Sequence, residues 1–324
     1  MGQLLKIQDY VSRYEVDIIR YTNQFVRLKK QQWQTFRENW ENRLAAGQMQ
    51  EVQEEEAAPD EDSRQLFSRI KHWLRKKNEV EMEELAEPVA PFQPGILQFS
   101  PQLVFFPETE DQLKKLFLDQ LFRFQLKWAS STLLEDSPIP AALYFDADLK
   151  YFLQRFPDTF LLLYKPVFVF KKAILEMETI LISPLAVWCL TFLEEEKDAV
   201  FFGSKSHFWE KRAGKNAKKI LNPVIALDRT EKIVRGILKQ HGVTIPIEKG
   251  LICRNGYITW PDAPQGLHIL DKRPHMEWFR HQRNLRSPLK YMQLKAAQAL
   301  LNECLAKSVA RKRRELEDHS RDGE

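Results

Sequence analysis

The residues best suited to chemistry in this 324-residue chain lie between Glu176 and Leu193, in two short apolar runs. A turn at Pro184 separates the runs, so the sequence predicts a pair of strands. A Mg²⁺-dependent nuclease could be built here, with one acid on the first strand and an acid and a lysine on the second. The acid and the lysine of the second strand would be two residues apart, because side chains two residues apart lie on the same face of a strand. Glu178 fills the first place and is the candidate metal ligand, whereas Thr191 and Leu193 occupy the other two.

An acid and a lysine with the required spacing do follow, at Glu195 and Lys197. They lie beyond the expected positions by roughly 13 Å along an extended strand. The run from Glu194 to Asp198 is also typical of a charged turn that ends a strand. A divergent nuclease would use Glu178, Glu195 and Lys197 as catalytic residues. The alternative is that the strand pair is retained and the catalytic centre is lost.

The strand pair and its surroundings resemble the nuclease-related domain (NERD) family of bacteria, whose fold is similar to that of restriction endonucleases. The similarity extends roughly from Asp146 to Trp260. The matching runs are Glu176 to Thr179, Ala186 to Leu193 and Asn222-Pro223.

This resemblance implies a restriction-endonuclease-like sheet core with a degenerate catalytic motif. It also implies an acid early in a helix, for which Asp146 and Asp148 are the candidates. Ala226 stands where the family has a glutamine, and Thr191 stands where it has an acid. The resemblance therefore supports the fold more than the activity.

Two later segments mix basic and aromatic residues, a composition that suits phosphate neutralisation and base stacking. One spans residues 272–295. The other spans residues 205–219 and is expected to be a loop, because Gly203, Gly214 and Asn216 are residue types typical of loops. Its candidate nucleic-acid contacts are Lys205, Trp209, Lys211, Arg212, Lys215, Lys218 and Lys219. Alternatively, the basic residues are ordinary solvent-exposed side chains that bind no nucleic acid, and Trp209 packs in the core.

Composition narrows the class of protein. With 44% hydrophobic and 11% aromatic residues, the chain can bury a sizeable core. Its three cysteines are far apart and form neither a disulfide framework nor a zinc site, which predicts a cytoplasmic protein. No apolar run is long enough to span a membrane. The net charge of +4 permits an anionic partner.

Other enzyme classes lack their motifs. There is no glycine-rich phosphate loop, no nucleophile elbow and no Cys-x-x-Cys pair, and the histidines are scattered. No cofactor is therefore expected, and Mg²⁺ is expected only if the chain is an active nuclease.

The predicted elements give an α+β or mixed α/β fold: a sheet core with a helical N-terminal extension and a C-terminal helix. A helix is expected over residues 4–43, within an N-terminal segment 1–46, and an acidic linker follows over 47–63. Residues 64–140 hold a basic amphipathic helix, a proline-rich connector and a further helix. The nuclease-related core is placed at 141–275, and a basic helix and tail at 276–324.

Several elements are expected within the core. Residues 167–170 and 200–202 should join the main sheet, and Asn255-Gly256 predicts a hairpin. Residues 222–241 read as a helix with an asparagine cap and a glycine stop. A closing helix is expected over residues 288–315.

Apolar residues between Ile7 and Leu28 recur at alternating steps of four and three, which is a heptad seam. The seam could pack on the chain's own core, or it could form a coiled coil with a second copy or a protein partner. The acidic linker predicts that residues 1–62 fold apart from the sheet.

Three hypotheses follow. The first is a catalytically degenerate nuclease-related protein that binds nucleic acid or a protein partner without cleavage. The second is a divergent Mg²⁺-dependent nuclease. The third is a structural, partner-binding scaffold that works through the seam and the basic amphipathic helix.

Overall fold

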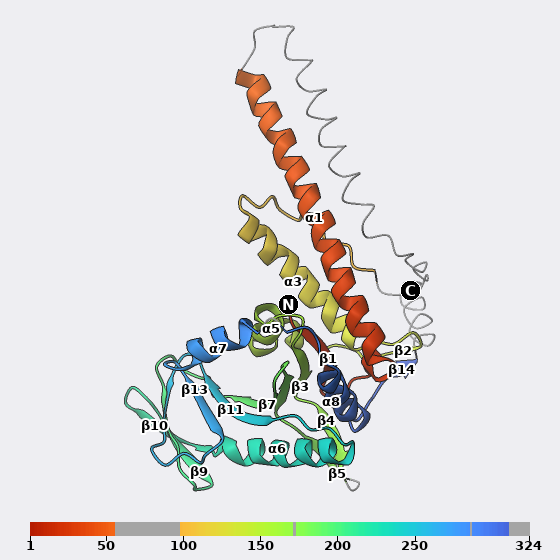
Figure 1. Ribbon diagram of the computed structural model, residues 1–324. Helices are drawn as coiled ribbons and strands as arrows, with labels where there is room; N and C mark the ends of the chain where they lie inside the picture. Colours follow the sequence, from red (N-terminus) through yellow and green to blue (C-terminus); the bar gives the residue numbers. More distant parts are fainter. Residues whose placement is uncertain (56–97, 171–172, 286, 311–324) are drawn as a thin grey trace, which may run out of the picture.

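The computed structural model describes residues 1–55, 98–170, 173–285 and 287–310 (Figure 1). A six-stranded mixed sheet with the order β1-β3-β6-β7-β11-β13 lies at its centre. The strands are β1 (Gln3–Ile7), β3 (Leu161–Tyr164), β6 (Thr179–Ile182), β7 (Val187–Phe192), β11 (Ile247–Cys253) and β13 (Leu267–Asp271). With helices packed around this sheet, the predicted mixed α/β class is confirmed.

The strand directions bring distant parts of the chain to one edge of the sheet. β1 is parallel to β3, and β7, β11 and β13 are parallel to one another. β6 is antiparallel to both β3 and β7. The carboxyl ends of five strands and the start of β6 therefore meet at one edge, which we call the carboxyl edge.

Helices α5 (Ala147–Arg155) and α6 (Pro223–Gln240) pack on opposite faces of this sheet. α6 forms as predicted: the Asn222 side chain accepts from the Val224 N–H, and Gly242 takes a φ of +61° after the last turn. It contacts β7 and β11. On the other face, Phe192 of β7 packs against Tyr151 of α5.

On this second face of the sheet, aromatic rings also connect α5 with helix α7 (His275–Arg283). Tyr151 of α5 and Phe156, which follows its last residue, contact Phe279, and Phe156 also contacts Trp278. Helix α8 (Tyr291–Asn302) contacts α6 and β6. The single closing helix expected over residues 288–315 is wrong in extent, because α8 ends at Asn302 and the short strand β14 (Val309–Ala310) follows.

The N-terminal segment differs from the helix expected over residues 4–43. Residues Gln3–Ile7 form β1 in the main sheet, a 3₁₀ turn η1 (Arg13–Glu15) follows, and α1 (Ile18–Glu55) starts only after it. Every residue of β1 is buried. A strand buried on both faces has no alternation of apolar and polar residues, so the sequence of β1 carries no strand pattern.

The heptad seam is an internal one. Ile7, Val11, Tyr14, Ile18 and Phe25 are all buried within the chain's own core. The seam is therefore not a surface for a second copy or a protein partner, and its alternative interpretation is corrected. Residues 1–46 likewise belong to the core through β1 and are not a separate helical segment.

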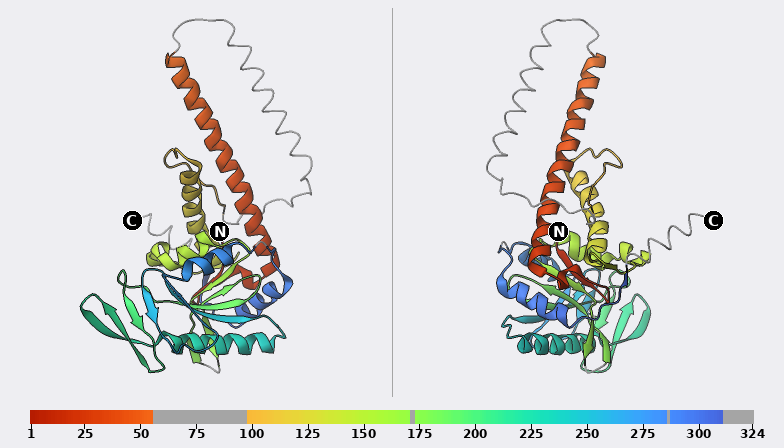
Figure 2. Two further views of the ribbon diagram at one scale, coloured as in Figure 1. Left: turned by 60° about the vertical axis from the view of Figure 1, so that its left-hand side comes forward. Right: turned by 90° about the vertical axis from the view of Figure 1, so that its right-hand side faces the viewer.

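Helix α1 projects from the body beside α3 (Glu110–Ala129), which forms where a helix was predicted (Figures 1 and 2). α1 continues to Glu55, so the first part of the predicted acidic linker is helical. The rest of that linker and the predicted basic amphipathic helix lie outside the described residues. Among the described helices, none is long and apolar enough to cross a membrane.

A second, four-stranded sheet has the order β10-β9-β8-β12 and stands at the side of the body, beyond the start of α6 (Figures 1 and 2). Its strands are β8 (Val200–Phe202), β9 (Phe208–Ala213), β10 (Asn216–Leu221) and β12 (Tyr257–Thr259). Residues 200–202 thus lie outside the main sheet, contrary to expectation. Asn255-Gly256 joins no hairpin, because β11 pairs within the main sheet and β12 pairs with β8.

The smaller elements complete the fold. β4 (Val167–Phe170) pairs with β5 (Ala173–Glu176) in a separate two-stranded sheet, so residues 167–170 also lie outside the main sheet. β2 (Glu135–Asp136) pairs with β14, and α4 (Ala141–Phe145) precedes α5.

Candidate functional site

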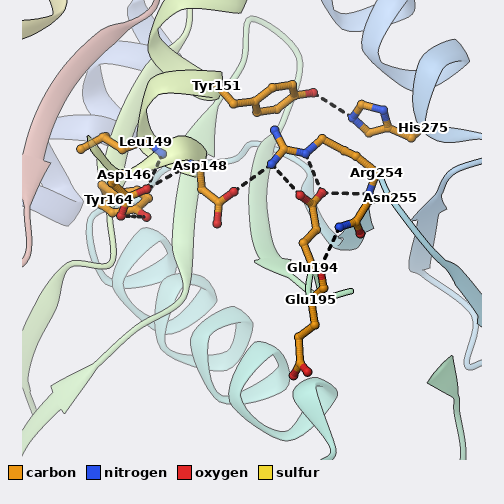
Figure 3. A network of polar contacts seen from close by, with 10 residues as sticks. All are labelled: Asp146, Asp148, Leu149, Tyr151, Tyr164, Glu194, Glu195, Arg254, Asn255 and His275. Carbon is orange, nitrogen blue, oxygen red and sulfur yellow. Dashed lines mark hydrogen bonds and ion pairs between the residues drawn. The ribbon is translucent and has the colours of Figure 1, made fainter. Parts of the chain in front are cut away.

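Arg254 is the centre of a charged cluster at the carboxyl edge (Figure 3). It follows β11 directly, and its Nε and Nη2 donate to the two carboxylate oxygens of Glu194 at 2.5 and 2.7 Å. Nη2 also lies 2.9 Å from Asp148 Oδ1 in the first turn of α5. The Arg254 backbone N–H donates to Glu194 Oε1 at 2.8 Å. One guanidinium therefore joins the ends of β7 and β11 to the start of α5.

The cluster is largely shielded from water. The exposed fractions of the Arg254, Glu194 and Asp148 side chains are 24%, 18% and 28%. Burial opposes the charge of Arg254, but the pairing with Glu194 and Asp148 raises its pKa. Burial raises the pKa of the Asp148 carboxyl, and the nearby Arg254 acts against this. The guanidinium also lies 4.5 Å from the Tyr151 ring centroid and 4.9 Å from that of Phe192.

The helix start beside Arg254 is held by Asp146. Its Oδ1 accepts from the Asp148 and Leu149 N–H groups at 3.0 and 2.9 Å, which caps α5. Its Oδ2 accepts from the Tyr164 hydroxyl at 2.7 Å. Both acids that the family resemblance suggested thus lie at the cluster: Asp146 as the cap and Asp148 as the ion-pair partner.

Tyr151 and His275 form a second polar contact next to Arg254 (Figure 3). The Tyr151 hydroxyl lies 2.8 Å from His275 Nε2. Burial lowers the pKa of His275 to about 4, and the charge of Arg254 acts in the same direction. At neutral pH the imidazole is therefore uncharged.

Glu178 occupies the place that the strand pair predicts. Thr179 pairs with Leu190 in the antiparallel register, which puts Glu178 opposite Thr191 at the carboxyl edge. Burial raises the pKa of the Glu178 carboxyl, while the Thr191 hydroxyl, Lys165 and Arg229 lower it. The neighbour across the strand pair is thus a hydroxyl, where a metal site would place a second acid.

The other two candidate catalytic residues lie elsewhere, in the turn between β7 and β8. Glu195 pairs with Lys211 of β9, as does Glu196, whose Oε2 lies 2.6 Å from Lys211 Nζ. Lys197 is exposed in this turn. This is the charged turn that the sequence offered as the alternative to an acid-and-lysine pair.

The predicted basic loop is a hairpin formed by β9 and β10. Because side chains alternate along β9, Trp209 and Lys211 face the interior. They are 1% and 4% exposed, and Trp209 Nε1 donates to the Ser204 carbonyl at 2.9 Å. Neither can contact nucleic acid from this position, so these two candidate contacts are corrected. The exposed candidates are Lys205, Arg212, Lys215, Lys218 and Lys219.

In the cluster around Arg254, the guanidinium is the cation that pairs with the carboxylates, in the place that a metal ion would take. Glu194 and Asp148 are both bonded to one guanidinium, whose fixed fork suits bidentate binding of a carboxylate. Across the part of the chain that the structure describes, no three His, Cys, Asp or Glu side chains could hold a metal ion together. The arrangement can cross-link three elements, and it places an uncharged imidazole and a phenol beside a positive charge.

Sequence reasoning missed Glu194, Arg254 and the Tyr151–His275 contact. One pattern could have indicated the first two: each follows an apolar run, and the two runs flank the well-marked helix α6. Such runs form parallel strands, and the carboxyl ends of parallel strands meet at one edge. The contact between Tyr151 and His275 has no local pattern, because the residues are 124 positions apart.

Comparison with known proteins gives one partial similarity. No known family model matches the chain, and no solved structure matches it. A stretch of 132 residues is 36% identical to a protein of Geobacillus stearothermophilus named RNA 2',3'-cyclic phosphodiesterase. This stretch covers 39% of the chain and 36% of the length of that relative. The similarity therefore concerns a minor part of both proteins.

Proposed function

We propose that this chain is a nuclease-related protein that binds nucleic acid without cleaving it. The element order α5, β3, β6, β7, α6 and β11 is compatible with the sheet core that the family resemblance implies. Glu178, Asp146 and Asp148 lie at the same edge of that sheet, where the resemblance would place its acids.

The observation that carries the proposal is the position of Arg254. Metal-dependent cleavage needs carboxylates that are open to Mg²⁺ and to the phosphate that the ion activates. Glu194 and Asp148 are instead bonded to a guanidinium that is charged at every ordinary pH. Thr191 and Leu193 add neither a strong metal ligand nor a positive charge.

Binding is supported by the exposed cations of the β9–β10 hairpin. Lys205, Lys215, Lys218 and Lys219 form no ion pair within the described ranges. Unpaired lysines can neutralise phosphates and release counterions, which gives weak, sequence-independent and salt-sensitive binding.

The test uses the purified full chain with fluorescently labelled RNA and DNA, in the presence of Mg²⁺ or Mn²⁺. We expect intact nucleic acid on a denaturing gel and a rise in fluorescence anisotropy that disappears as salt is added. Metal-dependent cleavage that is lost in Glu178→Gln and Lys197→Ala would overturn the proposal in favour of a divergent nuclease. An absence of binding at low salt would overturn its binding part.

A second candidate function, hydrolysis of 2',3'-cyclic phosphate ends of RNA, is favoured by the name of the partially similar relative. The Tyr151 hydroxyl and the uncharged His275 beside Arg254 are groups of the type used in proton transfer to and from a phosphate ester. Both side chains are buried, at 8% and 5% exposure, so this candidate requires an opening of the covering residues before a substrate can reach them. The measurement is conversion of a 2',3'-cyclic nucleotide to the 2'- or 3'-phosphomonoester, in which water adds to the phosphorus and one ester bond of the ring breaks. Activity that is lost in His275→Gln and kept in His281→Gln would establish this candidate.

A further inference from the structure

We infer that the outer face of the four-stranded sheet binds nucleic acid, and that its ligand is a single strand whose bases stack on exposed rings of that face. The inference rests on the proposed function, and it adds the surface and the form of the nucleic acid.

The register of the sheet sorts its side chains onto two faces. On β9, Trp209 and Lys211 point inward, and their neighbours Phe201 of β8 and Ile258 of β12 are buried too. The residues between them must point the other way. None of the side chains on this outer face is buried. β8, β9 and β10 are antiparallel to their neighbours in this set, and antiparallel strands commonly have one such solvated face.

Three aromatic rings lie on the outer face. Phe208 of β9 is 57% exposed, and Phe202 of β8 and Tyr257 of β12 are half-buried. Phe202 and Tyr257 are on adjacent strands and lie diagonally in the register, because Tyr257 pairs with Val200 and Phe202 pairs with Thr259. Exposed rings on a sheet surface are platforms on which bases of any sequence can stack.

Cations lie over two of these rings. The Arg212 guanidinium lies 4.7 Å from the centroid of Phe202, and Lys272 Nζ and the Arg273 guanidinium lie 5.6 and 5.7 Å from that of Tyr257. Lys219 of β10 is exposed on the same face, opposite Glu210.

Acids pair with three of these four cations, and the charge of Lys219 stays unpaired among the described residues. Glu210 pairs with Arg212, Asp198 with Lys272 and Asp271 with Arg273. Lys219 forms no ion pair among the described residues. Rings bordered by cations match the alternation of bases and phosphates along a single strand.

The same observations select among the alternatives. A duplex keeps its base faces stacked inside, so it could use the cations of this face but not the rings. A protein partner with an apolar surface would have to cover Arg212, Lys219, Lys272 and Arg273, at a cost in desolvation. A single strand can use both kinds of group, because its phosphates bind the cations and its bases stack on the rings.

The test measures anisotropy of a fluorescent single-stranded RNA and of the RNA duplex of the same length, at low salt, with the full chain. Tyr257→Ala should weaken single-strand binding roughly tenfold, the size of one lost stack, and Tyr257→Phe should restore it. Lys219→Glu should weaken binding and reduce the salt slope by about 0.7. Lys218→Glu makes the same charge change on the next residue, which points to the opposite face, so it measures the loss of binding that the change of charge alone causes.

The outcomes separate this inference from the proposed function. Preference for the single strand, with losses in Tyr257→Ala and Lys219→Glu that exceed that of Lys218→Glu, supports it. Binding by the unaltered chain that Lys219→Glu and Lys218→Glu weaken equally, and Tyr257→Ala does not change, overturns the inference and leaves the proposed function standing. No binding to either RNA overturns both, and the face would then suit a protein partner. Circular dichroism of each variant identifies any loss of fold.

Discussion

At the scale of single residues, Arg254 holds three elements together. Met in its place would still cover the rings of Tyr151 and Phe192, but it would leave the carboxylates of Glu194 and Asp148 facing each other without a cation. We expect Arg254→Met to lower the free energy of unfolding by about 2 kcal/mol at neutral pH, because partly buried charges would lose their partner. Urea unfolding measures this loss.

The control is Arg235→Met, which removes an arginine that is 61% exposed and paired with Glu231 one helical turn away. It should cost less than about 0.5 kcal/mol. The deficit of Arg254→Met should also shrink as the pH falls. Burial raises the folded-state pKa of Asp148, and the loss of Arg254 removes the charge that opposes this rise. The folded variant therefore binds an additional proton as the pH falls through the pKa of Asp148, and it gains stability when that proton binds. Equal losses of unfolding free energy in Arg254→Met and Arg235→Met would show that the Arg254 cluster stabilises the fold no more than an exposed ion pair does.

At the scale of elements, β1 is the part of the fold that the sequence predicted least well. Leu5 lies in its centre and is completely buried, whereas Ile19 at the start of α1 is 53% exposed. Leu5→Ala should cost about 2–5 kcal/mol in urea unfolding, the usual penalty for a cavity in a core. Ile19→Ala should cost less than about 0.5 kcal/mol. A chain that lacks residues 1–62 should lose its cooperative thermal transition, which is the reverse of what the acidic linker predicts.

Other elements could be predicted because their signals are local. The strand pair β6–β7 has two apolar runs around a turn, and α6 has a capping asparagine, a first-turn proline and a glycine stop. β9 and β10 were missed because lysines and glycines are typical of loops, and their strand character depends on pairing with β8. Asn255-Gly256 indicates a turn correctly, but the strands around it join different sheets.

At the scale of the whole molecule, the Arg254 cluster could not be predicted because topology alone brings its members together. Arg254 lies 60 positions from Glu194 and 106 from Asp148. Each of the three looks like an ordinary charged residue at the end of an element. The position of Glu178, in contrast, was predictable, because it depends only on the register of two consecutive strands.

The same arrangement predicts how the whole molecule responds to divalent ions. A metal site filled at a hundred times its dissociation constant would stabilise the fold by about 2.7 kcal/mol, which raises the melting temperature by several degrees. We expect Mg²⁺ and Mn²⁺ to shift it by less than about 1 °C, because Arg254 already pairs with both Glu194 and Asp148 and lies where a metal ion would bind. In Arg254→Met the two carboxylates become open to a cation, so Mn²⁺ should raise the melting temperature of this variant. Differential scanning calorimetry with and without EDTA measures both. A saturable rise in the unaltered chain that Glu178→Gln removes would contradict the prediction, since it would place a metal ion at the start of β6.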